Sequence, residues 1–226
     1  MVTVQRRCYI FALFLYCPAR QLVNAVPMID PTPVVYVVDD DSQSIWLIRQ
    51  LLQGIGVDCI GYTSPAQFLD TFVPRPCHCL ICDLRMPEFG GLEVQRRLLA
   101  RGASLPIIIV SGYPEVSAAV TAIKTGAFDF LEKPINGNLL IEKVQEALAL
   151  SRAQHTDKLQ QATREARIAL LSDKERQVVD RVLTGRSSRE IAEELSLSVR
   201  TIENHRASIM RKLRADSLAD LFRLFL

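Results

Sequence analysis

Short apolar runs alternate with amphipathic stretches from residue 34 to residue 150. The apolar runs predict five strands, at Val34–Val38, Val57–Tyr62, Cys79–Asp83, Ile107–Val110 and Phe128–Leu131. Apolar residues at helical spacing predict five helices, at about 42–54, 65–72, 91–101, 115–125 and 138–150. Because the strands are apolar on both faces, we expect a parallel α/β sheet that helices cover on both sides.

The pattern changes after residue 150, and no further strand is predicted. Residues 151–171 contain neither Pro nor Gly and are rich in helix formers, so they predict a helical linker. Residues 172–226 read as helical throughout, with capping-box starts at Ser172 and Ser187. The chain is therefore expected to have two domains, at 34–150 and 172–226.

The first 33 residues do not fit either domain. Two arginines precede an apolar run from Cys8 to Cys17, which is the layout of a secretory signal peptide. The run is too short to span a bilayer, which takes about 20 apolar residues. We expect a non-native or disordered extension, with Met28 as the true start, because Met28 lies just before the first strand. A signal-like or membrane-proximal segment and a packed part of the fold are the alternatives.

Acidic side chains follow two of the predicted strands. Asp39, Asp40 and Asp41 end the first strand, and Asp83 ends the third. In an open α/β sheet, ligands bind beyond the carboxyl ends of the strands, where these carboxylates would converge. Clustered negative charges need a cation, and oxygen ligands of this kind suit Mg²⁺. The sequence therefore predicts a magnesium site.

A hydroxyl and a lysine are expected at the same edge of the sheet. Ser111 follows the fourth strand and Lys133 follows the fifth. Together with a metal, these groups would bind the oxygens of a phosphoryl group carried by an aspartate.

On these residues, Val34–Leu150 resembles the receiver domain of two-component response regulators, a flavodoxin-like fold with a five-stranded parallel sheet. Receiver domains share the strand order of flavodoxin-like folds. The matching positions are the acidic pair Asp39 and Asp40, the phosphoacceptor Asp83, the switch residues Ser111 and Phe130, and the lysine Lys133.

The resemblance implies a mechanism. Mg²⁺ would be held by Asp40, Asp83 and the backbone carbonyl of Arg85, with Asp39 acting through water, and Asp83 would take a phosphoryl group from a sensor histidine kinase. Ser111 would then move toward the phosphate and Phe130 would rotate into the vacated space. The altered face would form a homodimer.

The C-terminal segment contains a helix-turn-helix pattern. A short helix at 189–195, a three-residue turn and a second helix at Val199–Leu213 are predicted. Ile202, Ile209 and Leu213 share one stripe of the second helix and face the core. The opposite face is the one that would enter the major groove.

Leu171–Leu226 resembles the LuxR-type DNA-binding domain, so the chain from Met28 resembles a NarL/FixJ-family response regulator, closest to the FixJ branch. The motif that carries this resemblance begins Thr201-Ile-Glu-Asn-His-Arg. The groove-facing positions are then Glu203, Asn204 and Ala207, and the phosphate contacts are Arg200, Arg206, Arg211 and Lys212. Glu203 suits cytosine and Asn204 suits adenine.

Four cysteines, Cys59, Cys77, Cys79 and Cys82, lie outside the N-terminal extension. Side chains alternate along a strand, so Cys79 and Cys82 should point to opposite faces and cannot share one tetrahedral ion. We interpret these cysteines as buried apolar residues in a reducing, cytoplasmic compartment.

The expected function is a phosphorylation-controlled transcription factor rather than an enzyme, with Mg²⁺ as cofactor. Its partners would be a sensor histidine kinase, promoter DNA and RNA polymerase, and no membrane. One alternative is a haloacid-dehalogenase-like phosphatase, because Asp39 and Asp41 also fit its nucleophile loop. That family needs a further acidic pair, which does not follow Lys133. The other alternative is a degenerate receiver that binds DNA constitutively.

The composition is that of a folded protein of 226 residues. The net charge of the chain becomes informative only when it is counted separately for its two halves. The total of +2 is too small to indicate a nucleic-acid partner. Residues 34–150 carry −4, whereas residues 151–226 carry +4. This distribution agrees with an acidic signalling domain joined to a basic DNA-binding half.

Overall fold

The computed structural model describes residues 32–113 and 116–225. Its N-terminal part is a five-stranded parallel sheet in the order β2-β1-β3-β4-β5. The strands are β1 (Val34–Val38), β2 (Asp58–Tyr62), β3 (His78–Asp83), β4 (Ile107–Ser111) and β5 (Asp129–Glu132). The expected fold class is confirmed, and no strand boundary differs from the predicted one by more than one residue.

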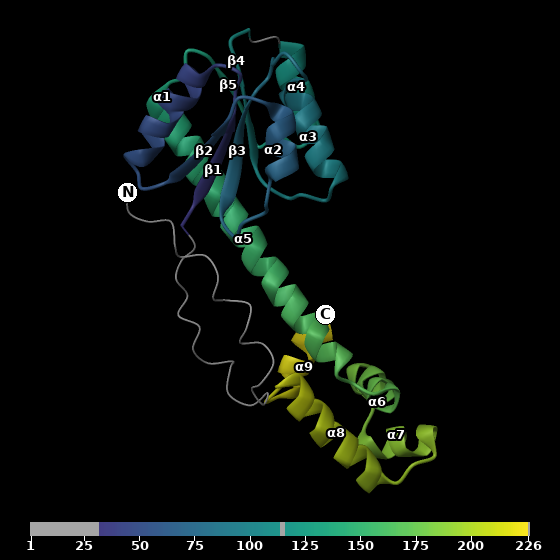
Figure 1. The fold of residues 1–226 in the computed structure, drawn as a ribbon. Coiled ribbons are helices and arrows are strands. Elements are labelled where there is room, and N and C mark those ends of the chain that lie inside the picture. The colour runs from purple at the N-terminus through teal and green to yellow at the C-terminus, as the bar shows by residue number, and fades with distance from the viewer. Residues whose placement is uncertain (1–31, 114–115, 226) are drawn as a thin grey trace, which may run out of the picture. The chain divides into compact units, whose positions relative to one another are not determined.

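Helices cover both faces of this sheet (Figure 1). They are α1 (Ser42–Gln53), α2 (Pro65–Thr71), α3 (Gly91–Ala100), α4 (Val116–Lys124) and α5 (Gly137–Ala169). Residues of α1 and α5 form one apolar cluster with the sheet, and residues of α2, α3 and α4 form the other. Both faces of the strands are therefore buried, as their continuous apolar runs require.

The helices begin where the local sequence supplies caps. Asp41 accepts hydrogen bonds from the amides of Gln43 and Ser44 at the start of α1. Ser64 caps α2, whose first residue is Pro65. These side chains bind amides that have no partner within their own helix, and so they determine where each helix begins.

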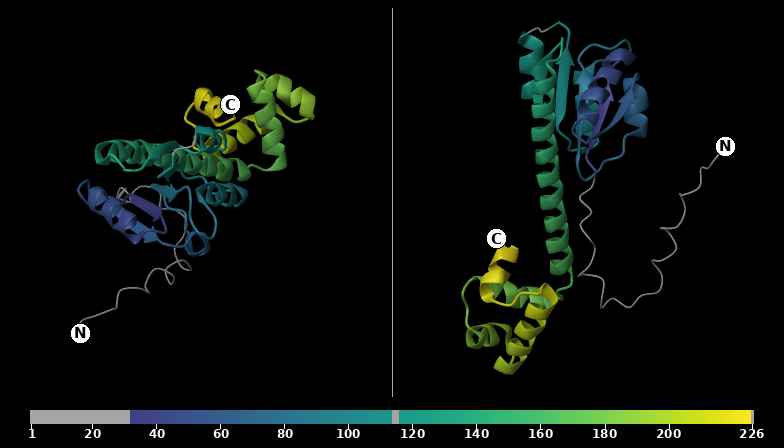
Figure 2. Two further views of the ribbon diagram at one scale, coloured as in Figure 1. Left: turned by 90° about the horizontal axis from the view of Figure 1, so that it is seen from above. Right: turned by 90° about the vertical axis from the view of Figure 1, so that its left-hand side faces the viewer.

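The helix after β5 is much longer than the sequence pattern predicts. We expected a helix at 138–150 and a helical linker at 151–171, and the structure joins the two as α5, one helix of 33 residues (Figure 2). Uninterrupted helix formers and the absence of Pro and Gly after Gly137 explain this continuity. Within the described residues, no helix is long and apolar enough to cross a membrane.

The C-terminal part consists of four helices around one apolar cluster. They are α6 (Asp173–Leu183), α7 (Ser188–Leu195), α8 (Val199–Leu213) and α9 (Leu218–Phe225). The expected capping boxes are present at Ser172 and Ser187. Ile202 on α8 is buried in this cluster, as the sequence predicts, and so is Ala192 on α7. The N-terminal extension falls almost entirely outside the described residues.

Candidate functional site

Two aspartates lie buried at the carboxyl ends of neighbouring strands. Asp39 follows β1 and is 3% exposed, and Asp83 ends β3 and is 7% exposed. Their side chains are brought together because β1 pairs with β3 in parallel register, with Val38 beside Cys82. The convergence that the sequence predicts is therefore present.

Lys133 joins these two carboxylates. Its Nζ donates to Asp39 Oδ2 at 2.7 Å and to Asp83 Oδ1 at 2.6 Å. The lysine is held at this edge because its amide donates to the carbonyl of Ser111 at the end of β4. Three strands thus contribute to one charged cluster.

Main-chain amides satisfy the remaining carboxylate oxygens. Asp39 Oδ1 accepts from the amide of Asp41 at 2.9 Å, and Asp83 Oδ2 accepts from the amide of Arg85 at 2.7 Å. Burial raises the pKa of Asp39, although the hydrogen bond from Lys133 opposes this effect. Burial also disfavours the charge of Lys133, but the hydrogen bonds to Asp39 and Asp83 outweigh it and raise the pKa of this lysine.

The cluster has more negative than positive charge. One ammonium faces two buried carboxylates, and Asp40, the next residue after Asp39, is exposed. Such a set of oxygens suits a hard divalent cation. In the described part of the chain, no three acidic, histidine or cysteine side chains are placed to hold a metal alone. A main-chain carbonyl such as that of Arg85 and water would have to complete the coordination.

The hydroxyl of Ser111 is engaged by its own loop. Ser111 Oγ donates to the carbonyl of Tyr113 at 3.0 Å and accepts from the Tyr113 amide at 3.2 Å. The Tyr113 ring is 71% exposed and lies 5.4 Å from the guanidinium carbon of Arg85. Arg85 and Tyr113 therefore connect the loops after β3 and β4, a contact that sequence reasoning missed because the two residues are far apart in the chain.

Glycine is required where α3 begins beside the end of β3. A Cβ on Gly91 would stand 2.6 Å from the carbonyl oxygen of Asp83, closer than real Cβ atoms approach. The first turn of α3 can approach the main chain of Asp83 this closely only if residue 91 has no side chain.

The remaining receiver predictions concern Phe130 and the cysteines. Phe130 is half-buried on β5 and packs against the α2–α3–α4 cluster. Cys79 belongs to the α1–α5 cluster and Cys82 to the opposite one, so the two point to opposite faces as expected.

The second candidate site is the outer face of α8. Its exposed residues are Arg200, Glu203, Asn204, Ala207 and Arg211. Ile202, Ile209 and Leu213 are buried on the other side of the helix. The predicted division of α8 into a core face and a solvent face is therefore present.

Two residues predicted to bind phosphate make contacts inside this domain. Lys212 Nζ donates to Glu175 Oε2 at 2.6 Å, and Ser208 donates to the same carboxylate at 2.7 Å. Arg206 donates to the hydroxyl of Ser188 at 3.3 Å. These contacts direct both side chains toward α6 and α7, and the phosphate contacts of Arg206 and Lys212 stay predictions.

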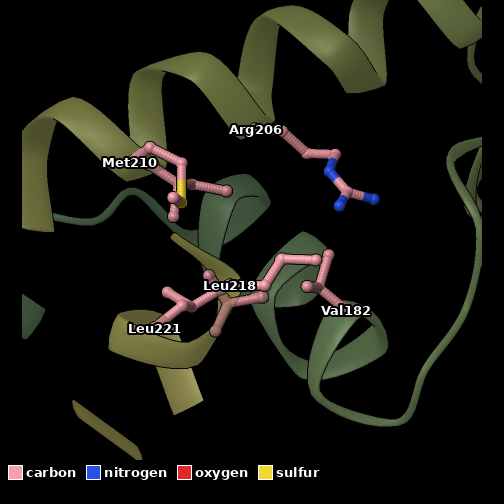
Figure 3. Close-up of a pocket in the computed structure, with 7 residues that line it drawn as sticks. Val182, Arg206, Met210, Leu218 and Leu221 are labelled. Atoms are coloured by element: carbon pink, nitrogen blue, oxygen red, sulfur yellow. The ribbon is translucent and has the colours of Figure 1, made fainter. Parts of the chain in front are cut away.

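Arg206 also borders a small apolar pocket of about 120 Å³ between α6, α8 and α9. Figure 3 shows Arg206 and Met210 of α8 facing Val182, Leu218 and Leu221 across this space. The stem of Arg206 thus packs on the inner side of α8, away from the exposed face.

Comparisons with known proteins cover both parts of the chain. Residues 35–145 match the family described as the response regulator receiver domain, and residues 169–225 match the bacterial regulatory proteins of the luxR family. The transcriptional regulatory protein FixJ of Azorhizobium caulinodans is 40% identical over 192 residues, which cover 85% of this chain and 91% of FixJ. The response regulator protein TmoT of Ectopseudomonas mendocina is 38% identical over 197 residues, covering 87% and 90%.

The fold is also similar to that of a response regulator of known structure. The response regulator StyR matches with a TM-score of 0.81 and 32% identity, over 86% of this chain and 98% of StyR.

Proposed function

Because the chain belongs to the NarL/FixJ family of two-component response regulators, with a receiver and a LuxR-type DNA-binding domain, we propose that phosphorylation of Asp83 controls its dimerisation and DNA binding. A sensor histidine kinase supplies the phosphoryl group. We assign the receiver to 34–150, the linker to 151–171 and the DNA-binding domain to 172–226, with 1–33 as an extension.

The buried Asp39–Lys133–Asp83 cluster carries this proposal. An oxygen of the Asp83 carboxylate attacks the phosphorus of phosphohistidine, and the phosphorus–nitrogen bond breaks as the new phosphorus–oxygen bond forms. Lys133 is placed to offset charge on the transferred oxygens, where positioning and electrostatics do most of the work. Asp39, Asp40, Asp83 and the Arg85 carbonyl would hold Mg²⁺, which supplies further positive charge when bound.

Phosphorylation adds about −1.5 to −2 charges at Asp83. Ser111 is the switch residue: its hydroxyl leaves the main chain of Tyr113 and binds the phosphoryl group. Phe130 then turns into the space that Ser111 vacates. The remodelled α4–β5 face pairs with a second copy, and two linked domains bind two half-sites more tightly than one domain binds one.

On DNA, we assign base contacts to Glu203, Asn204 and Ala207 and phosphate contacts to Arg200 and Arg211. The bound dimer then acts with RNA polymerase at a promoter in the cytoplasm. The protein is a regulator, and its chemistry is limited to Mg²⁺-dependent self-phosphorylation and slow autodephosphorylation.

Incubation with Mg²⁺ and acetyl phosphate tests the phosphoacceptor. We expect one stable phosphoryl group per chain, detected by intact mass, and none on the Asp83→Asn variant. Asp41→Asn is the matched control, because Asp41 caps α1 and asparagine caps equally well. Continuous phosphate release at enzymatic rates would support a hydrolase instead, and absence of any label would support a constitutive DNA-binding protein.

A second measurement tests the output. Footprinting of the phosphorylated chain on genomic DNA should give paired half-sites, and the Asp83→Asn protein should lose them. Full phosphate-dependent control of the target promoter in cells that carry Asp83→Asn would contradict the mechanism.

A further inference from the structure

The helix α4 buries little apolar surface against the receiver. Among the described residues of α4, Ala122 alone is buried, and Ala118 is half-buried against the α2–α3–α4 cluster. The larger apolar side chains are exposed, with exposed fractions of 80% for Val116, 45% for Val120 and 48% for Ile123. Because burial of an alanine stabilises far less than burial of a large side chain, apolar packing holds the orientation of α4 only weakly.

A buried glutamine of the neighbouring helix α3 binds the C-terminal end of α4 (Figure 1). Gln95 is 1% exposed, and its Nε2 donates to the carbonyl of Ala122 at 3.3 Å. The hydroxyl of Thr125, just after α4, lies 3.2 Å from Gln95 Oε1. A buried amide with an unused donor or acceptor costs free energy, so Gln95 favours the one placement of α4 in which both of its groups are bonded.

The Thr125 hydroxyl has one proton and three oxygens within reach. Besides Gln95 Oε1, these are the carbonyls of Thr121 at 2.9 Å and Ala122 at 3.0 Å. Both carbonyls already accept a main-chain amide, from Thr125 and Ala127 respectively. Because Gln95 Oε1 is buried and has no other donor among the described residues, we assign the proton to this bond.

The main chain fixes the same end of the helix. Gly126 has a φ of 98°, and its amide donates to the carbonyl of Ile123 at 3.0 Å. The amide of Ala127 donates to the carbonyl of Ala122 at 2.9 Å, which completes a Schellman ending. The carbonyl of Ala122 thus accepts from the turn and from Gln95, so the turn and α3 hold the same atom.

We propose that Gln95 is a positioning residue: from α3, it sets the orientation of α4 and of the exposed apolar strip formed by Val116, Val120 and Ile123. The helix α3 is itself placed beside the end of β3, where Gly91 lies one turn before Gln95. The consequence for pairing rests on the proposed function, in which the α4–β5 face dimerises. Two copies related by a two-fold axis must present the same strip at the same angle, so a strip without a fixed orientation pairs weakly.

Residual dipolar couplings of the unphosphorylated full chain test the orientation directly. Gln95→Met keeps a side chain of similar length but cannot donate a hydrogen bond. We expect the couplings of amides 116–124 to change while those of α1 stay the same, and the amides of Gly126 and Ala127 to lose about tenfold in exchange protection. A uniform loss of protection across the receiver with unchanged couplings in α4 would overturn the proposal, as would no change at all.

A second pair of variants keeps the inference testable if Gln95→Met does not fold. Thr125→Val changes an exposed residue, removes the donor to Gln95 Oε1 and should alter the couplings of amides 116–124. Thr121→Val is the matched control, because the Thr121 hydroxyl donates within its own helix, to the carbonyl of Ser117 at 2.7 Å. Equal changes in the two variants would overturn the proposal, because they would assign the effect to helix propensity rather than to the contact with α3.

Dimerisation of the phosphorylated chain gives the functional readout. Acetyl phosphate with Mg²⁺ should label the natural chain and Gln95→Met to the same extent, and sedimentation should then give a dimer dissociation constant about tenfold weaker for the variant. Equal dissociation constants would overturn the role of Gln95 in positioning the dimer face. A natural chain that carries the phosphoryl group but stays monomeric would contradict the proposed function instead, and the dipolar couplings would still decide the role of Gln95.

Discussion

The acidic cluster of the receiver and the outer face of α8 differ in how much of their geometry exists before a partner arrives. Asp39, Asp83 and Lys133 are held by one another within 2.7 Å. The side chains on the outer face of α8, such as Asn204 and Arg211, are exposed to solvent, and no contact within the domain fixes the geometry that we propose they take on DNA. The geometry of a buried site can therefore be inferred from the folded structure, whereas the role of an exposed interface is inferred largely from the types of residue that it contains.

This difference has an energetic consequence. Breaking a buried charge network changes both stability and function, because a remaining charge loses its partner away from water. Removing an exposed side chain leaves stability within about 0.5 kcal/mol of its original value and changes only binding. The variants below test that division.

Lys133→Met should have the largest effect on stability. It leaves Asp39 and Asp83 buried without a cation, and breaking such a pair costs about 3–5 kcal/mol. Urea unfolding at pH 7 measures the loss, and Mg²⁺ should restore more stability to this variant than to the natural chain. Lys143→Met is the control, because its acidic partners are partly exposed and a surface ion pair is worth about 0–1 kcal/mol. Equal stability of the two variants would contradict the buried-pair argument.

Glu175→Gln should have the next largest effect and should depend on pH. Burial favours the neutral acid, but the bonds from Lys212, Ser172 and Ser208 outweigh it and lower the pKa of Glu175 to about 2. A lowered pKa in the folded state stabilises the protein above the ordinary value of 4.5, and this stabilisation is lost as the pH falls toward 2.

We therefore expect Glu175→Gln to lose about 1.5–3 kcal/mol at pH 7, as for hydrogen bonds to a charged group. The difference from the natural chain should shrink as the pH falls below 4.5. Glu190→Gln is the control, because Glu190 completes the second capping box but is exposed. A difference that stayed constant from pH 7 to pH 3 would exclude the ionised carboxylate as its source.

Asn204→Ala should change sequence preference without changing stability. A good bidentate contact to a base discriminates by about 1–3 kcal/mol, and the exposed Asn204 has no part in the core. Binding selection on randomised half-sites measures the preference position by position. Uniform weakening on all sequences would instead assign Asn204 to the phosphate backbone.

Arg211→Ala should have the smallest effect. Losing one phosphate contact makes the slope of log affinity against log salt less steep by about 0.9. The neighbouring Lys212 is the internal comparison: Lys212→Gln should lower the free energy of unfolding and leave the salt slope unchanged, because its ammonium binds Glu175. A less steep salt slope with unchanged stability in Lys212→Gln would instead support a contact between Lys212 and DNA phosphate.

The element types could be predicted from sequence because each leaves a local pattern. The apolar run of β1, the capping boxes at Ser172 and Ser187, and the apolar stripe of α8 all depend on residues a few positions apart. The same holds for the acidic residues after β1 and β3, whose convergence follows from the parallel sheet.

Contacts between distant residues left no such pattern. Three contacts join residues that are far apart in the sequence. They are the stacking of Arg85 on Tyr113, 28 positions apart, the bond from Lys212 to Glu175, 37 positions apart, and the bond from His78 to Ser151, 73 positions apart. Lys212 is an example. Its charge and its position on α8 predict a DNA contact, but its ammonium binds the buried carboxylate of Glu175 at 2.6 Å.

The sequence alone determined the class of each element, the two-part organisation and the residue types that meet at the ends of β1 and β3, because periodicity, capping and strand direction are local properties. The tertiary structure decided which charges are buried and paired, that α5 runs unbroken into the linker, and where His78 meets that helix. Those outcomes depend on how whole elements pack, since burial and partner distance are set by all the neighbouring elements together.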